Sequence, residues 1–407
     1  GVTGASSSSS ASAASAAPDF GFDSLSLDWL RAKPGAKWHR HGVPWNAWVA
    51  DMDFPPPPCV DQAIRAVLDS GDIGYPDWRH VTGGSPAATA FAERCAARYG
   101  WTFDPEHLRE LNDVLQGIQI VLHLCTEPGD GVVVHTPAYP PFLHSVEDNG
   151  RRVVRVPASR SADSPSGWTF DHEALDARLA AGEQAKVLLL CHPHNPTGHV
   201  FSEDELRSLA AIAERHDLLV ISDEIHADLT YAPLTHRPMA LFAPERTVTI
   251  HAASKAFNLA GLRYAIMHVA PAWVRERFGT VPDHMFGATN LMGSAAAEAV
   301  WRHGDEWLDA VVAHLDGQRR FLGDLLAMYL PDVVYTPPQG TYLAWLDFRT
   351  MDLGDDPSAA FVGNGVRLSE GPNFGPEGHG FARLNFATST EVLRGTVRAM
   401  TGELGDP

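Results

Sequence analysis

Between about residues 105 and 270, short β-branched runs alternate with segments that have a helical pattern. Continuous apolar runs of this length, separated by helix-length segments, are typical of strands in a mostly parallel sheet that is covered on both faces. The alternation therefore predicts an α/β fold for this part of the chain. The predicted strands are DGVVVHTP, AKVLLLCHP, DLLVISDE, TVTIHAAS and YAIMHV.

One connecting helix has a clear start signal. In SEDELRSLAAIAERHD, Ser202 can cap the helix with Glu205 three residues later. An apolar stripe with helical spacing follows. This helix lies between two predicted strands, so the three elements form a βαβ unit, for which a right-handed crossover is expected. The stripe is Leu206, Leu209, Ala210, Ile212 and Ala213.

At 407 residues the chain is long enough for two domains. We predict a large domain over residues 61–295 and a smaller α+β domain over 296–407, because the pattern after about residue 295 changes to long helices followed by a few strands. The N-terminal segment, residues 19–60, is expected to contribute to the small domain. Residues 1–18 are rich in Ser, Ala and Gly and predict a flexible tail.

Charge and cysteine content narrow the possible partners. Acidic residues outnumber basic ones by 50 to 31, and no Lys/Arg cluster is present, which disfavours nucleic acid and anionic membranes and favours a small-molecule substrate. No run approaches the roughly 18 apolar residues of a membrane helix, and the N-terminus lacks the pattern of a signal peptide. The four cysteines are far apart, as expected for reduced thiols in a cytoplasmic protein.

Polar side chains follow four of the predicted strands. Ligands of open α/β sheets bind beyond the carboxyl ends of the strands. Tyr139, Asn195, Asp223 and Lys255 each follow a strand and are therefore expected to meet at one edge. Each of them alone has an ordinary explanation, such as a turn, a cap or packing. The pair His192 and His194 lacks the further ligands of a metal site, so no metal is predicted.

Lys255 stands among small and apolar residues in HAASKAFNLAGLR. A lysine rarely buries its charge without a partner. Desolvation in an apolar pocket lowers the pKa of an ammonium group and favours reaction of the neutral amine with an aldehyde. The surroundings of Lys255 therefore predict a Schiff-base lysine, with a surface lysine as the alternative.

These motifs resemble those of a known family, the fold-type I pyridoxal-phosphate (PLP) enzymes of aminotransferase class I/II. The similarity runs from about residue 30 to 400, and its most specific parts are HNPTG, SDEIH, SKAFNLAGLR and GFARLNFA. Within the family, WVADMDFPPPP, IGYPDW and EPGDGVVVHTPAYPPF look most like the bacterial C-S β-lyases of the MalY/PatB type. The resemblance implies a large domain with a mostly parallel sheet and a smaller α+β domain.

The resemblance also implies roles for the strand-end residues. Lys255 would bind PLP as a Schiff base, and Asp223 would keep the ring nitrogen protonated so that PLP acts as an electron sink. Asn195 would contact the phenolic oxygen, with His226 as a second contact, and Tyr139 would stack on the ring. Glu224 is expected to point to the opposite face of its strand.

The cofactor phosphate needs backbone donors and a cation. The glycine in NDVLQGIQIVLHLC is expected to open a helix, whose N-terminus suits a phosphate, so Gly117 and Ile118, with Gln119, are candidates. The alternative is that Gly117 only permits close packing. The resemblance assigns Arg263 to the phosphate, and Ser254, a further candidate for cofactor binding, lies beside Lys255.

Two further positions follow from the resemblance. Many relatives have a hydroxyl residue three before the lysine, where this chain has Ala252, so one phosphate hydrogen bond is expected to be missing or replaced. Tyr75 corresponds to a tyrosine that reaches the phosphate from the neighbouring subunit, which implies a homodimer.

The expected reaction is β-elimination from an amino acid. Arg383 matches the family's carboxylate arginine and offers a planar bidentate donor, and Tyr139 is expected beside the substrate. The MalY/PatB likeness favours a lyase that cleaves cystathionine or related cysteine S-conjugates, with Lys255 as general base. An aminotransferase and a catalytically silent PLP-fold regulator are the alternatives.

Overall fold

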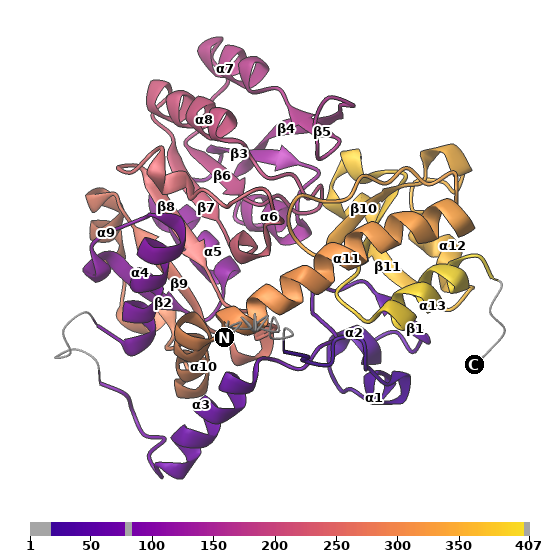
Figure 1. Cartoon of the computed structure of the whole chain (residues 1–407). Helices are drawn as coiled ribbons and strands as arrows, with labels where there is room; N and C mark the ends of the chain where they lie inside the picture. Colours follow the sequence, from indigo (N-terminus) through magenta and orange to yellow (C-terminus); the bar gives the residue numbers. More distant parts are fainter. Residues whose placement is uncertain (1–17, 78–83, 403–407) are drawn as a thin grey trace, which may run out of the picture.

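The computed structural model describes residues 18–77 and 84–402 of the chain (Figure 1). Apart from residue 18, the predicted flexible tail lies outside the described residues. No helix in the described ranges is long and apolar enough to cross a membrane. Two sheets organise these residues, with eight strands in one and four in the other.

The larger sheet contains all five predicted strands. Its strand order is β2-β9-β8-β7-β6-β3-β4-β5. Strands β8, β7, β6, β3 and β4 pair in parallel, whereas β2, β9 and β5 pair antiparallel at the two ends. The mostly parallel sheet is therefore confirmed, with antiparallel borders. The strands are β2 (Leu108–Leu111), β3 (Gly131–Thr136), β4 (Arg152–Arg160), β5 (Trp168–Phe170), β6 (Val187–Cys191), β7 (Leu219–Asp223), β8 (Thr247–His251) and β9 (Ala265–Val269).

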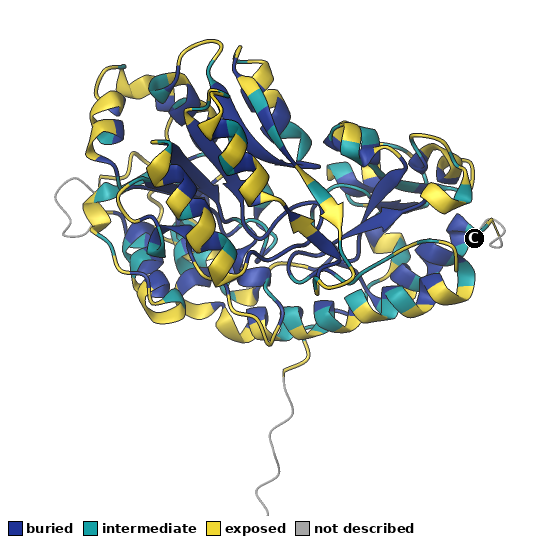
Figure 2. Ribbon diagram, turned by 90° about the horizontal axis from the view of Figure 1, so that it is seen from above, coloured by how far each residue is buried: buried dark blue, intermediate teal, exposed yellow. Residues whose placement is uncertain are grey.

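Helices cover this sheet on both faces. Alternate residues of a strand point to opposite faces, and in β3 Val132 and Val134 enter one core cluster whereas Val133 enters another. Figure 2 shows the buried strands between helices whose outer sides are exposed. The helices of the whole described chain are α1 (Leu27–Arg31), α2 (Ala36–His39), α3 (Pro58–Asp69), α4 (Pro86–Tyr99), α5 (Val114–Cys125), α6 (Pro140–Glu147), α7 (His172–Ala180), α8 (Glu203–Arg215), α9 (Ala272–Phe278), α10 (Leu291–His303), α11 (Asp305–Tyr329), α12 (Ser358–Val362) and α13 (Thr390–Met400).

Helix α8 begins as the sequence predicts. The Ser202 hydroxyl accepts a hydrogen bond from the Glu205 backbone N–H at 3.1 Å, and the Glu205 carboxylate accepts one from the Ser202 N–H at 2.9 Å. The helix joins β6 to β7, which pair in parallel. The capping box and the βαβ arrangement are thus confirmed, and the apolar stripe packs on the sheet through Leu206, Leu209, Ile212 and Ala213.

The smaller sheet combines both ends of the chain. Its order is β1-β11-β12-β10, and the N-terminal strand pairs in parallel with β11. The long helix α11 runs from the larger sheet to this one (Figure 1). Helix α10 packs against α3 and α4 beside the larger sheet. The domain limits given above stay a prediction. The strands are β1 (Trp45–Ala47), β10 (Leu343–Asp347), β11 (Val366–Glu370) and β12 (Phe381–Asn385).

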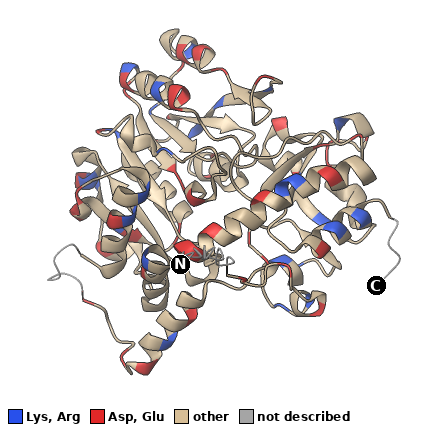
Figure 3. Cartoon of the chain, viewed as in Figure 1, with Lys and Arg blue, Asp and Glu red and all other residues tan. Residues whose placement is uncertain are grey.

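Charged side chains of both signs share the outer helices. Figure 3 shows Lys and Arg among Asp and Glu on α8 and α11. Some of them form helical ion pairs, such as Arg207 with Glu203 at 2.7 Å and Arg319 with Asp316 at 2.7 Å. Such pairs contribute little stability each, and they fit a solvated surface.

Candidate active site

The carboxyl ends of β3, β6, β7 and β8 meet at one cavity of about 140 Å³. Its wall includes Tyr139, Asn195, Asp223 and Lys255, which follow or end those strands. Residues 112–115, at the start of helix α5, and Ala50 from the N-terminal segment are also part of the wall. The structure thus brings together the four strand-end residues that the sequence places at this edge.

Lys255 reaches the cavity from the loop after β8. Its Nζ donates a hydrogen bond to the Ala50 carbonyl oxygen at 2.8 Å, and the buried Tyr342 hydroxyl donates to the same oxygen at 2.7 Å. Burial lowers the pKa of Lys255; the nearby positive charge of Arg383 also lowers it, whereas the carboxylates of Asp51 and Asp223 oppose the lowering. The neutral, nucleophilic amine is therefore more accessible near neutral pH than for a surface lysine.

Asp223 is the last residue of β7 and is 5% exposed. Burial raises the pKa of Asp223 to about 7, although a hydrogen bond from the Ile225 backbone N–H at 3.1 Å favours the charged form. No lysine, arginine or histidine of the described chain lies within ion-pair distance of this carboxylate. Asp223 is therefore a buried acid that lines the cavity without a cationic partner in the described chain.

Glu224 faces the other side of the strand, as the alternation predicts. Its carboxylate is held by His236 Nε2 at 2.6 Å, by the Ser222 hydroxyl at 2.7 Å and by the Met239 N–H at 3.2 Å. This group lies behind the sheet, away from the cavity that Lys255 lines.

Arg383 lies on β12 of the smaller sheet and points toward Asn195. Its Nη1 donates to the Asn195 side-chain oxygen at 3.1 Å, and its Nη2 donates to the Trp48 carbonyl at 3.0 Å and the Ser369 hydroxyl at 3.3 Å. Burial lowers the pKa of Arg383 to about 10. Its Nε has no hydrogen-bond partner, and no carboxylate in the described ranges pairs with it. The guanidinium is thus buried and held in place without a counter-ion, which suits a carboxylate ligand.

Tyr139 and His226 border the same cavity. Tyr139 precedes helix α6, and burial raises the pKa of its hydroxyl. Burial lowers the pKa of His226 to about 3, so this imidazole is neutral, and its Nδ1 has no partner. Both side chains can therefore face an aromatic ligand without adding a charge.

The expectation for Gly117 and Ile118 differs from the structure. Helix α5 begins at Val114, three residues earlier than expected, so both residues lie inside the helix and outside the cavity wall. A Cβ at Gly117 would lie 2.7 Å from the Leu111 side chain, and Ile118 is fully buried. Gly117 therefore permits close packing, which is the alternative stated above, and Gln119 is exposed.

The backbone donors at the cavity are those of residues 113–115. Asp113 caps helix α5 by accepting the Gln116 N–H at 2.7 Å, and its carboxylate also pairs with the Arg263 guanidinium. Ser254 and Ala252 line the same end. A helix N-terminus, an arginine and a serine hydroxyl form a suitable anion site, in which Ala252 adds no hydroxyl.

Tyr75 lies away from the Lys255 cavity of its own chain. It is fully exposed, and it borders a groove of about 740 Å³ between helix α3 and helix α10. Within its own chain it does not line the Lys255 cavity.

The sequence pattern did not indicate three residues that contribute to this site. Ala50 acts through its carbonyl, which no side-chain motif reveals, and Tyr342 comes from a distant loop. Asp113 had a usable signal, because an Asp directly before an apolar helical run is a common N-cap. The two histidines of the HxH pair have ordinary partners. The His192 ring hydrogen-bonds with the Arg237 carbonyl, and the His194 ring with the Thr197 hydroxyl.

The sequence of this chain is similar to those of known proteins. The profile of the aminotransferase class I and II family matches residues 49–399. A protein of Mycobacterium tuberculosis named putative cystathionine beta-lyase is 36% identical over 94% of this chain and 98% of its own length. Cystathionine beta-lyase PatB of Bacillus subtilis is 32% identical over 90% and 96%.

A solved structure agrees with these relatives. The PLP-bound C-S lyase from Staphylococcus hominis superposes with a TM-score of 0.84 at 30% identity, covering 92% of this chain and 96% of that one. The fold is therefore that of the PLP-dependent enzymes, as expected. Since the family profile spans most of its length, this chain belongs to the aminotransferase class I and II family, in its MalY/PatB-type branch.

Proposed function

We propose that the protein is a PLP-dependent C-S β-lyase that cleaves cystathionine or a related cysteine S-conjugate to a thiol, pyruvate and ammonia. The observation that carries this proposal is the meeting of Lys255, Asp223 and Asn195 at one cavity. Arg383 is hydrogen-bonded to Asn195 beside them. The choice of a lyase within the family is supported by relatives that are named cystathionine beta-lyase.

The residues of the cavity fit PLP. The buried Asp223 carboxylate lacks a cation, and a protonated ring nitrogen supplies one. Lys255 is placed to bind the aldehyde carbon, Asn195 and His226 the phenolic oxygen, and Tyr139 the ring face. When bound, PLP supplies an electron sink for the pair released at the substrate α-carbon.

The phosphate is assigned to the other end of the cavity. The opening of helix α5, Arg263 and Ser254 offer backbone, cationic and hydroxyl donors. Because Asp113 pairs with Arg263, binding of the phosphate requires this ion pair to rearrange. The backbone donors at residues 113–115 take the place of the Gly117 and Ile118 donors that the sequence suggested.

Substrate binding and proton transfer are assigned to three groups. Arg383, oriented by Asn195 and Trp48, binds the α-carboxylate. Lys255 Nζ removes the α-proton, for which its lowered pKa favours the neutral amine. The Ala50 carbonyl then accepts a hydrogen bond from the protonated Nζ and keeps it near the cavity.

An aminotransferase remains the second candidate, because the family includes such enzymes and the same residues serve both reactions. The two differ in where the proton returns. A silent regulator has no need for a complete set of Lys255, Asp223, Asn195 and Arg383, so we do not favour it.

We further propose a homodimer in the cytoplasm. The exposed Tyr75 and Ile73 beside the α3–α10 groove suit a second copy of the chain, in whose active site Tyr75 reaches the phosphate. The four cysteines are free thiols, as a reducing compartment maintains them. Light scattering of the purified protein tests the dimer, and loss of PLP affinity in Tyr75→Phe tests the contact between subunits.

Two experiments test the proposed function. Protein purified with PLP should absorb visible light, and Lys255→Ala should abolish that absorbance; absorbance that survives the substitution would refute the cofactor assignment. Incubation with L-cystathionine without a keto acid should release pyruvate, ammonia and thiol in equal amounts. Activity that requires an added keto acid would identify an aminotransferase instead.

A further inference from the structure

A groove of about 540 Å³ lies where the C-terminal end of helix α4, helix α8 and residues 235–242 meet. It shares no lining residue with the Lys255 cavity. Its volume is within the roughly 300–1,000 Å³ of small-molecule sites. We call it the α4–α8 groove.

Three arginines from three different segments line the α4–α8 groove. They are Arg98 of α4, Arg207 of α8 and Arg237 of the segment 235–242, and among the described residues no carboxylate lines the groove. The chain as a whole has the opposite balance, with 50 acidic and 31 basic residues. The groove is therefore a local concentration of positive charge on an acidic protein.

The three arginines differ in their ion pairs. Arg237 is exposed and forms no ion pair within the described chain. Arg207 pairs with Glu203 at 2.7 Å, but both side chains are exposed, and such pairs contribute little stability. Arg98 uses its Nε for Asp228 at 3.2 Å. Arg237 is therefore available to a ligand, and Arg207 can exchange its partner for a ligand at little cost.

The ring of Phe242 brings two of these guanidinium groups together. The guanidinium carbon of Arg207 lies 5.0 Å from the ring centre, and that of Arg237 lies 5.9 Å from it. Both distances are within the roughly 6 Å of a cation–π contact. Two like charges are thus held beside one ring, and an anion bound to both offsets their mutual repulsion.

The segment that carries Arg237 is held by the core of the larger sheet. His236 Nε2 donates to the Glu224 carboxylate at 2.6 Å, and the Met239 N–H donates to the same group at 3.2 Å. The Arg237 carbonyl accepts a hydrogen bond from the His192 ring at 3.1 Å. The backbone of this segment is therefore fixed before a ligand arrives, which lowers the entropy that binding costs.

A buried polar atom without a partner adjoins the α4–α8 groove. His236 lines the groove, is 4% exposed, and its Nδ1 has no hydrogen-bond partner in the described part of the chain. Buried polar atoms normally have one. An imidazole that carries both protons donates from both nitrogens, so an anion in the groove is a suitable partner for this nitrogen.

We propose that the α4–α8 groove is a second binding site, which takes a compact oxyanion with at least two negative charges. Guanidinium groups match the oxygen atoms of phosphate and carboxylate groups in pairs of hydrogen bonds. Arg207 and Arg237 bind these oxygen atoms, and Arg98 adds positive charge from the α4 side. The assignment is independent of the reaction that takes place at Lys255.

Calorimetric titration of the PLP-loaded protein tests the site, because the phosphate of the bound cofactor keeps the probes out of its own site. Pyrophosphate and citrate are the probes, and the ionic strength is held constant because salt screens exposed charges. At least one probe should bind once per chain. Tighter binding of pyrophosphate would identify a phosphorylated ligand, and tighter binding of citrate a polycarboxylate. If neither binds at millimolar concentration, the assignment is overturned.

Charge-removing variants locate the bound probe. Arg237→Gln should raise the dissociation constant roughly tenfold or more, because charge-assisted hydrogen bonds are lost, and Arg207→Gln should act in the same direction. Arg320→Gln is the matched control, since it removes an exposed arginine that pairs with Asp316 on helix α11, and it should keep the wild-type affinity. An equal loss in Arg320→Gln, or full affinity in both groove variants, would show that the groove is not the site.

Arg383→Gln separates the groove from the active site, where Arg383 also suits an anion. Binding of the probe should persist in this variant. Loss of binding in Arg383→Gln, together with unchanged binding in Arg237→Gln, would place the probe at the active site and overturn the assignment. The visible absorbance of bound PLP shows that each variant is folded, and if Arg237→Gln does not fold, the comparison of Arg207→Gln with Arg320→Gln decides.

Discussion

Asp223, the last residue of β7, and Glu224, which follows it, are both buried and carry the same functional group, yet their surroundings differ. Glu224 receives three hydrogen bonds from its own chain, including one from His236. Asp223 receives one, from the Ile225 N–H, and burial raises the pKa of Asp223 to about 7. The chain completes the contacts of the carboxylate that supports the fold and leaves those of the other to a ligand.

The largest expected effect comes from Asp223→Asn. Loss of the carboxylate removes the partner of the protonated ring nitrogen, so kcat/KM for L-cystathionine should fall by roughly 10³-fold. The unfolding free energy of the apoprotein should not fall, because no ion pair of the chain is broken. An equal loss of activity in Glu224→Gln, with unchanged stability, would show that Glu224 rather than Asp223 alone serves the reaction.

The second-largest effect is expected in the pH dependence of the unfolding free energy, to which the raised pKa of Asp223 contributes. The pKa of Asp223 is raised from near 3.9 in the unfolded chain to about 7 in the folded one. Between these values the folded state holds a proton that the unfolded state has released, so this group lowers stability progressively as pH rises from about 4 to 7. Relative to Asp223→Asn, the wild-type apoprotein should therefore lose on the order of a few kcal/mol of unfolding free energy over this range.

Urea unfolding of both apoproteins at pH 5 and pH 8 measures this difference. Subtracting the variant removes the contribution of the buried histidines, whose lowered pKa values act in the opposite direction. A difference that is independent of pH would show that Asp223 titrates normally.

Glu224→Gln should act on stability. The amide replaces a charged acceptor of hydrogen bonds from His236 and Ser222, so the unfolding free energy should fall by roughly 2–3 kcal/mol. Turnover per folded, PLP-loaded molecule should stay within a few-fold of the wild type. Thermal unfolding together with active-site titration checks both statements; a stable but inactive Glu224→Gln protein would contradict the structural role.

Ala252→Ser should have the smallest effect, at the phosphate end of the same cavity. A hydroxyl there adds a donor where the chain has none, so PLP should bind as tightly as in the wild type or up to about tenfold more tightly. Ala253→Ser, a neighbouring buried alanine that is not on the cavity wall, is the matched control. Clear weakening in Ala252→Ser alone would show that the phosphate lies elsewhere.

The sequence predicted what depends on local pattern. The five strands, the capping box of Ser202 and the polar residues at the strand ends follow from periodicity and spacing, and the direction of Glu224 follows from strand alternation. Gly117 predicts a start of helix α5 that is three residues too late, because the cap is Asp113 and the helix begins at Val114.

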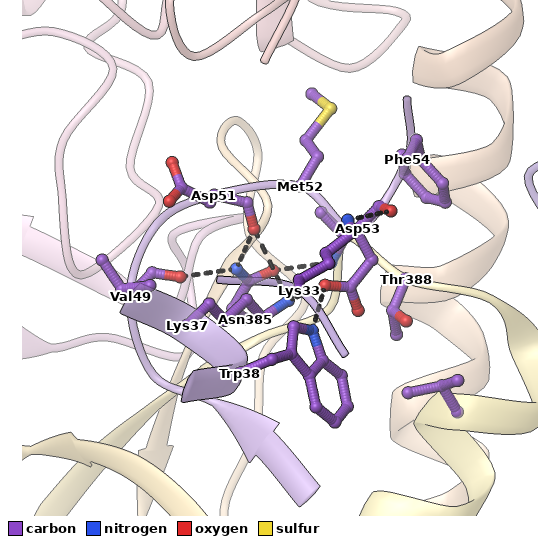
Figure 4. Close-up of polar contacts among 12 residues, drawn as sticks. Lys33, Lys37, Trp38, Val49, Asp51, Met52, Asp53, Phe54, Asn385 and Thr388 are labelled. Atoms are coloured by element: carbon purple, nitrogen blue, oxygen red, sulfur yellow. Dashed lines mark hydrogen bonds and ion pairs between the residues drawn. The ribbon is translucent and has the colours of Figure 1, made fainter. Parts of the chain in front are cut away.

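The parts of the site that the sequence did not predict depend on contacts between residues far apart along the chain. Residues 49–54 are held by Asn258 and by Asn385 (Figure 4), each more than 200 residues away along the chain. The Ala50 carbonyl accepts hydrogen bonds from Lys255 and Tyr342. A single sequence contains no periodic signal for such contacts, so the position of the Ala50 carbonyl beside Lys255 could not be anticipated from it.

The protonation state of the PLP ring tests the contrast between the two acids most directly. Nitrogen-15 NMR of the protein loaded with ring-labelled PLP reports whether the ring nitrogen carries a proton. We predict a protonated nitrogen in the wild type and in Glu224→Gln, and an unprotonated one in Asp223→Asn. A protonated ring nitrogen in Asp223→Asn, or its loss in Glu224→Gln, would contradict the account.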